Sequence, residues 1–164
     1  NDMKIRTDYV TNSSSSSFIM AFKDDEDYKE FCETCGWMNC PEVLEMIENM
    51  REHASSKNDI KEMVYRYYAW NKEDEVLKSL GVDASMPYME KYKIIETEEY
   101  KKKVNEQVEA DQEYVNLLAH LDSCDIVTDG MIWDTNGGIF EWAIRNGFLR
   151  KEFPRWCVLN WNVG

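Results

Sequence analysis

The chain has 164 residues and a formal net charge of −13, because 32 aspartates and glutamates oppose 19 lysines and arginines. This length predicts one domain, spanning residues 3–164. The acidic balance argues against direct binding to nucleic acid or to an anionic membrane, since both depend on basic side chains. No apolar run reaches the roughly 20 residues of a membrane helix, so no membrane span is expected.

The N-terminal part of the chain predicts a connection followed by a strand. Residues 1 and 2 precede Met3, which we expect to be the native start. The serine run Ser13–Ser17 is typical of a loop. Large apolar residues alternate over Phe18–Phe22 and predict a buried strand that ends at Lys23.

The next part of the chain predicts four helices. Each has an acidic or Asn residue that can cap its start, followed by apolar residues at spacings of three and four. The caps of the first two are Asp24 or Asp25 and Asn39, and those of the third and fourth are Asp59 and Asn71. Gly36 and Gly81 are expected to end the first and the fourth helix.

The remainder predicts a mixture of strands and helices. A short strand is expected through Tyr92 and Ile94, and the longest helix over residues 97–121, capped by Thr97. Residues 126–133 read as a hairpin with an Asp129-Gly130 turn. A short helix over residues 139–146 and a final strand over residues 157–163 follow. The fold class is therefore α+β: a small, mainly antiparallel sheet built from both chain ends, covered by four to five helices from the middle.

The negative charge is concentrated in the middle of the sequence. Residues 1–23 carry a net charge of +1 and residues 125–164 carry −1, whereas residues 24–124 carry −13. This acidic helical region includes a stripe at helical spacing, formed by Glu42, Glu45, Glu48 and Glu52. A solvated helix face explains such a stripe. The functional alternative is a non-enzymatic interaction protein, an inhibitor or regulator that binds a basic partner through these residues.

The serine run also suggests an anion site. Successive backbone N–H groups and hydroxyls can hold a phosphate group, and the residues in question are Asn12, Ser13, Ser14, Ser15, Ser16 and Ser17. The alternative is a tight connection whose hydroxyls bond to its own backbone. The first reading predicts a protein that binds a phosphate-bearing ligand.

Three of the five cysteines cluster within nine residues. Cys32, Cys35 and Cys40 include one half of a zinc-binding pattern, but Cys124 and Cys157 stand alone and supply no second half. Cys32 and Cys35 also fit the apolar stripe of the first helix, which favours buried structural thiols. We therefore predict no metal or other cofactor. The odd number of cysteines favours a reducing, cytoplasmic setting.

A second group of acidic residues surrounds the expected hairpin. Asp125, Asp129 and Asp134 could hold a divalent cation in a small-ligand or metal-dependent enzyme. The simpler explanation is that Asp129 forms the turn and Asp134 ends a strand. His53 and His120 belong to no recognisable catalytic pattern, and no phosphate-loop or zinc-protease motif occurs. No residue is therefore nominated as catalytic.

One resemblance concerns the start of the chain. Residues 3–19 have a basic segment, then Tyr9-Val10-Thr11-Asn12, then the serine run that ends at Phe18. This opening resembles that of a loose set of small uncharacterised bacterial proteins and covers about a tenth of the chain. The resemblance implies a bacterial or phage-derived cytoplasmic protein. It carries no activity, so it transfers no functional residue.

Overall fold

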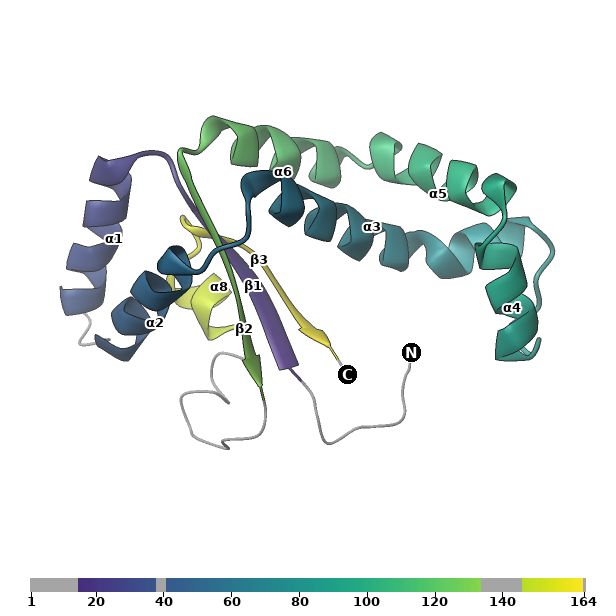
Figure 1. The fold of residues 1–164 in the computed structure, drawn as a ribbon, viewed down its shortest axis with the longest axis horizontal. Helices are drawn as coiled ribbons and strands as arrows, with labels where there is room; N and C mark the ends of the chain where they lie inside the picture. Colours follow the sequence, from purple (N-terminus) through teal and green to yellow (C-terminus); the bar gives the residue numbers. More distant parts are fainter. Residues whose placement is uncertain (1–14, 38–40, 134–145, 164) are drawn as a thin grey trace. The chain divides into compact units, whose positions relative to one another are not determined.

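The computed structural model describes residues 15–37, 41–133 and 146–163 (Figure 1). The chain divides into two compact units, one formed by residues 1–60 and 121–164 and the other by residues 61–120. In chain order the described elements are β1 (Ser15–Phe22), α1 (Asp25–Trp37), α2 (Pro41–Glu52), α3 (Lys57–Ser79), α4 (Tyr88–Ile95), α5 (Glu98–Ala110), α6 (Gln112–Ser123), β2 (Ile126–Trp133), α8 (Phe148–Glu152) and β3 (Cys157–Val163). Over the described ranges, no helix is both long and apolar enough to cross a membrane.

The sheet has three antiparallel strands in the order β2-β1-β3. The central strand comes from the start of the chain and its two neighbours come from the end, so the predicted α+β class and the predicted origin of the sheet are confirmed. Ser15 pairs with Trp133 and Phe22 with Ile126 across β1 and β2. The pairing of β1 with β3 shifts register between Ile19 and Met20, as in a β-bulge.

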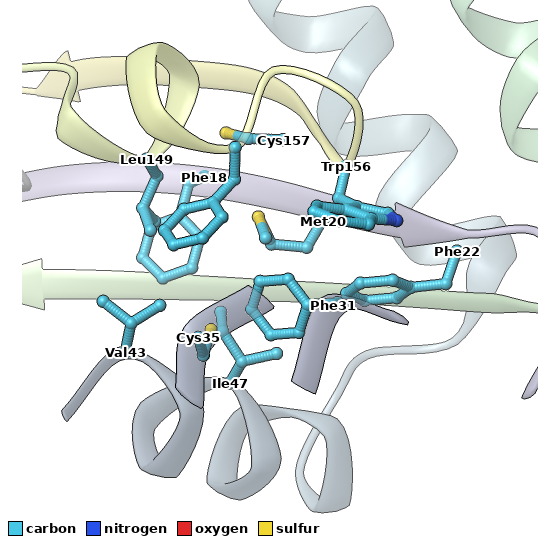
Figure 2. Close-up of a cluster of buried hydrophobic side chains, with 11 residues drawn as sticks. Phe18, Met20, Phe22, Phe31, Cys35, Val43, Ile47, Leu149, Trp156 and Cys157 are labelled. Carbon is cyan, nitrogen blue, oxygen red and sulfur yellow. The ribbon is translucent and has the colours of Figure 1, made fainter. Parts of the chain in front are cut away.

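One face of the sheet carries the main core of the first unit (Figure 2). Residues alternate between faces along a strand, so the large side chains of β1 at positions 18, 20 and 22 share this face. Phe31 of α1 lies at its centre and makes edge-type ring contacts with Phe22, Phe153 and Trp156 at centroid distances of 5.2–5.4 Å. Such pairs contribute about 0.5–1.5 kcal/mol each beyond the burial of their surface. Val43 and Ile47 of α2 complete the layer, and both are buried.

The third and fourth predicted helices are one continuous helix, so the expected start at Asn71 is wrong. α3 spans 23 residues, and Ser56 caps it by accepting a hydrogen bond from the Asp59 N–H. The helix ends at Ser79, and Gly81, the residue predicted to end the fourth helix, lies in the turn that follows. Gly81 adopts a φ of +80°, and the Val82 N–H bonds back to the Leu77 carbonyl. This is a C-terminal motif that favours glycine.

The longest predicted helix is two helices, because Asp111 interrupts it. Asp111 leaves the helical conformation with ψ of 111°, and its Oδ1 accepts a hydrogen bond from the Glu113 N–H at 3.0 Å. Its Oδ2 accepts from Lys72 Nζ of α3 at 2.7 Å. Asp111 therefore caps α6 and binds α3 at the same time. The predicted cap of α5 is confirmed, since Thr97 accepts from the Tyr100 N–H.

The predicted strand through Tyr92 and Ile94 is wrong, because these residues belong to helix α4. Pro87 precedes the helix with φ of −56° and ψ of 144°, which places it at the N-cap. Apolar residues at positions 92 and 94 match a period of two, but Tyr88 and Tyr92 also match the i, i+4 spacing of a helix. The short run could not distinguish the two patterns.

The predicted hairpin over residues 126–133 is also wrong, because these residues form the single strand β2. Gly130 lies in the middle of the strand for a packing reason. A Cβ atom at this position would overlap Met50 Sδ of α2 and lie 2.8 Å from Phe18 Cζ. The glycine thus permits close approach of α2 to the sheet. The final predicted strand, β3, is confirmed. The helix expected over residues 139–146 falls outside the described residues, apart from Asn146.

Candidate functional site

The most distinctive charged feature of the first unit is the exposed side of α1, α2 and the residue before α1, here called the acidic surface. Between Asp24 and Glu52 the chain has nine exposed carboxylates and only two exposed basic side chains, those of Lys29 and Arg51. The nine acidic residues are Asp24, Asp25, Glu26, Glu30, Glu33, Glu42, Glu45, Glu48 and Glu52. The predicted stripe of four glutamates is therefore exposed, and their role in binding stays a prediction.

The acidic surface is held in place by the opposite sides of its helices. Phe31 and Cys35 of α1 and Val43 and Ile47 of α2 are all buried in the core beneath it. A rigid packed layer keeps exposed groups in a fixed arrangement, which reduces the entropy lost when they bind a partner. The core therefore fixes the two helices from which the carboxylates project.

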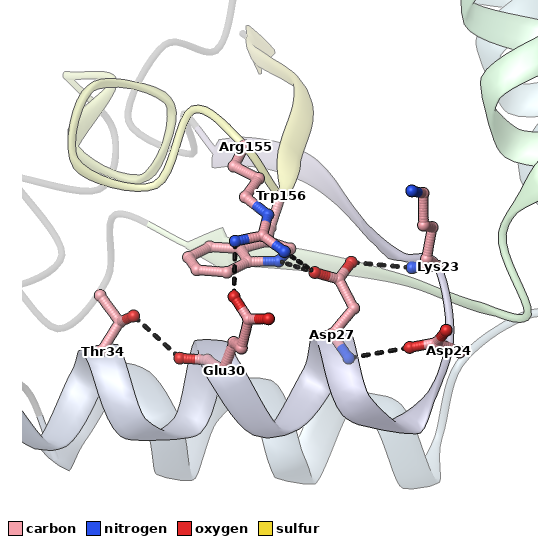
Figure 3. Close-up of polar contacts among 7 residues, drawn as sticks. All are labelled: Lys23, Asp24, Asp27, Glu30, Thr34, Arg155 and Trp156. Atoms are coloured by element: carbon pink, nitrogen blue, oxygen red, sulfur yellow. Dashed lines mark hydrogen bonds and ion pairs between the residues drawn. The ribbon is translucent and has the colours of Figure 1, made fainter.

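A network around Asp27 joins α1 to the segment before β3 (Figure 3). Asp27 is only 9% exposed. Its Oδ1 accepts hydrogen bonds from Arg155 Nη2 at 2.6 Å and from Trp156 Nε1 at 3.1 Å. Its Oδ2 accepts from the Lys23 N–H at 2.9 Å. Arg155 also donates to Glu30 Oε2 at 2.7 Å. One guanidinium group therefore pairs with a buried and an exposed carboxylate.

These contacts change the proton affinity of Asp27. Burial by itself raises the pKa of this carboxyl group, but the hydrogen bonds from Lys23 and Trp156 and the charge of Arg155 outweigh it. The pKa of Asp27 is lowered from its ordinary value of 3.8. Asp27 is consequently ionised at neutral pH, although it is buried.

Burial and the nearby charge of Glu48 also affect two groups at the inner edge of the acidic surface. Burial raises the pKa of Tyr28 to about 12, and the charge of Glu48 adds to this shift. Burial also raises the pKa of the Cys32 thiol, again with a contribution from Glu48. Arg51 lies over the Tyr28 ring, 4.5 Å from its centroid. A raised thiol pKa disfavours the reactive thiolate, so Cys32 is suited to packing rather than to nucleophilic chemistry.

The serine run is not a loop over its last three residues, which corrects the sequence interpretation. Ser15, Ser16 and Ser17 lie in β1, are buried, and pair with β2 on one side and β3 on the other. A central strand uses its backbone N–H groups in both ladders. These are the groups that an anion-binding turn would need. Asn12, Ser13 and Ser14 lie outside the described residues, so phosphate binding by this segment stays a prediction.

The cysteines do not converge in the described part of the chain. Cys32, Cys35, Cys124 and Cys157 form no disulfide bond with one another, and the last three are buried. Over the described ranges, no group of three or more His, Cys, Asp or Glu side chains could hold a metal ion. Cys40 falls outside these ranges. The structure thus favours packing as the role of Cys35, Cys124 and Cys157.

The predicted carboxylate group is separated along the sheet. Asp129 lies in β2 and accepts hydrogen bonds from the Ser55 N–H and the Ser55 hydroxyl, both at 3.0 Å. Asp125 precedes β2 and lies beside Lys23, at the end of β1 that is farther from the serines. At the usual rise per residue, Ser16 is about 23 Å from Lys23 along β1. Asp134 lies outside the described residues. Asp125 and the serines therefore do not meet in one site.

Sequence reasoning did not single out Asp27, Arg155 and Trp156. Asp27 looked like one of several acidic residues in a helix start, and Arg155 lies 128 positions away. A contact at this separation leaves no periodic signal in a single sequence. The only available hint was a basic residue beside a Trp immediately before the final strand.

The fold and this site define an α+β protein with an acidic two-helix surface. In comparisons with protein-family models, curated proteins and solved structures, none matched this chain. Function is therefore inferred from its own geometry and charge.

Proposed function

We propose that this protein is a non-enzymatic interaction protein that binds a basic partner protein through the acidic surface, as an inhibitor or regulator. The observation that carries the proposal is the ratio of nine exposed carboxylates to two exposed basic side chains between Asp24 and Glu52. Complementary charge accelerates encounter with a basic surface and selects against acidic competitors.

The packing beneath the acidic surface supports this proposal. The core contacts of Phe31 and Ile47 fix the two helices, and the Asp27 network ties α1 to the chain before β3. Solubility alone needs charge but no fixed arrangement of it.

The test compares two variants with the same change in charge. The first replaces the α2 stripe with E42Q, E45Q, E48Q and E52Q. The control removes four exposed carboxylates from the second unit with E62Q, E75Q, E106Q and E109Q. Each protein is used to recover partners from its native host at low and at high salt, and each recovered partner is then purified and its Kd measured.

We expect a basic partner whose affinity falls as salt increases, because exposed charges are screened within a Debye length of about 10 Å at 0.1 M salt. The α2 variant should bind this partner more weakly, and the control variant should bind it as the unmodified protein does. An equal loss in both variants would show that only total charge matters. That result would refute the acidic surface as the site.

A further inference from the structure

The second unit presents an exposed aromatic surface on α4. Tyr88 is 70% exposed, Met89 is 68% exposed and Tyr92 is 45% exposed, and no residue of α4 is buried. Single exposed apolar residues are common, but adjacent ones on a helix mark candidate contact surfaces. Aromatic residues and Met are enriched in protein interfaces. This group, here called the α4 aromatic surface, is separate from the acidic surface in sequence.

The two tyrosine rings are placed close enough to act on one ligand group. Tyr88 and Tyr92 are one helical turn apart, their centroids are 6.3 Å apart and their planes are tilted by 35°. A cation is attracted to a ring face when it lies within about 6 Å of the centroid. One cation can therefore lie within this distance of both ring centroids.

A carboxylate beside the α4 rings favours a cationic ligand. From Asp83 to the C-cap residue Glu96, the chain has three acidic residues and two lysines, a net charge of −1. One lysine, Lys91, donates a hydrogen bond to the Ala84 carbonyl at 3.0 Å. The Glu96 carboxylate lies next to Tyr92 and raises the pKa of its hydroxyl through a side-chain hydrogen bond. Exposed rings beside a carboxylate form a suitable site for a positively charged side chain.

We propose that Tyr88, Tyr92 and Glu96 form a docking site for an arginine side chain of a partner protein. The guanidinium group is planar, stacks on aromatic faces and is more weakly hydrated than the ammonium group of lysine. Glu96 supplies a carboxylate that the guanidinium group can bind. The basic character of the partner rests on the proposed function, whereas the site itself rests on the ring geometry.

The experiment titrates the isotope-labelled full chain with an arginine-rich peptide and a lysine-rich peptide of equal length and charge, observed by NMR. Two double variants separate the ring contribution from simple apolar contact. The Y88F and Y92F pair keeps both ring faces, and the Y88L and Y92L pair keeps apolar bulk without rings. Circular dichroism checks that α4 and the rest of the chain remain folded.

We expect the amide signals of α4 to shift with the arginine peptide at lower concentration than with the lysine peptide. The leucine pair should weaken arginine binding at α4 by about 2–5-fold, the range that corresponds to an exposed cation–π contact. The phenylalanine pair should retain most of this binding, because it keeps both ring faces and loses only the Tyr92 hydrogen bond to Glu96. Unchanged affinity in the leucine pair, or no shift in α4, would overturn the proposal.

The same titration separates this proposal from the proposed function. The E42Q, E45Q, E48Q and E52Q variant should lose shifts in α1 and α2 and keep those in α4. If only α4 responds in the unmodified protein, the arginine site stands and the acidic surface fails. If only α1 and α2 respond, the acidic surface stands and the arginine site fails.

Discussion

Arg155 Nη2 lies 2.6 Å from Asp27 Oδ1, and this contact joins the chain before β3 to the first turn of α1. It connects residues 128 positions apart in sequence. The guanidinium group also lies 5.0 Å from the ring centroid of Trp156, whose indole N–H donates to the same carboxylate oxygen. Helix α1 is thereby held to the sheet by a polar contact as well as by the core.

Replacing Asp27 should therefore destabilise the first unit. D27N removes the negative charge and replaces one acceptor oxygen with an amide NH₂ group that faces N–H donors. This change should lower the free energy of unfolding by about 1–3 kcal/mol, as for a disrupted buried hydrogen-bonded group. Urea denaturation measures this change. D25N is the matched control, because the Asp25 side chain is 92% exposed and 3.7 Å from Arg51. Its effect should stay within about 0.5 kcal/mol. Equal effects of the two variants would contradict the buried role of Asp27.

The contribution of Asp27 should also depend on pH in a defined direction. Its folded pKa is lowered, so the unfolded chain takes up this proton more readily than the folded chain. The stabilisation is complete above the unfolded pKa and is lost as the pH falls through the folded pKa. The stability difference between the unmodified protein and D27N should be constant from neutral pH to about pH 5 and shrink below about pH 4. A difference that persists unchanged in acid would exclude ionisation as the cause.

Adding a methyl group to Gly130 should disturb the contact between α2 and β2. In G130A the new Cβ meets Met50, which can move, and the buried ring of Phe18, which has no free space. We expect a loss of about 1–3 kcal/mol in unfolding free energy, typical of overpacking. The double variant with M50A should recover part of this loss. If G130A alone proves neutral in thermal unfolding, the glycine has no packing role.

The break between α5 and α6 gives a prediction for the second unit. D111A removes the α6 cap and the partner of Lys72, and should cost about 1–2 kcal/mol, in the range of a lost N-cap. D111N keeps a capping oxygen and should cost less. Hydrogen exchange of the first α6 amides reports the effect locally. Faster exchange in both variants to the same degree would show that the Lys72 ion pair, not the cap, holds the break.

Local signals predicted the elements whose ends and faces are set within a few residues. Asp24 caps α1 through the Asp27 N–H, and Val43 and Ile47 face the core as their spacing indicated. The final strand was equally clear from its alternation. These features depend on backbone capping and on burial of one face, which a single sequence records directly.

The errors arose where tertiary contacts chose between two local solutions. The Asp129-Gly130 pair is a strong turn signal, but both residues lie in β2. Asp129 accepts hydrogen bonds from Ser55, and the missing side chain of Gly130 leaves space for Met50. The sequence around Asp111 is compatible with a continuous helix, but in the structure Asp111 ends α5 and its carboxylate binds Lys72 of α3. For the candidate site, helical spacing predicted the α2 glutamates. The sequence does not single out the α4 tyrosines, because the spacing of Tyr92 and Ile94 predicts a strand in that segment.

The strand order has a consequence for how the chain folds. β1 lies between β2 and β3, and both neighbours are synthesised more than a hundred residues later. The apolar segment Phe18–Phe22 therefore has no sheet partner until more than a hundred further residues have been synthesised. Contacts between distant residues also form slowly, whereas the helices within residues 61–120 contact residues closer in sequence. A nascent chain would thus carry a helical middle section beside an apolar strand that stays unpaired until β2 and β3 have been made.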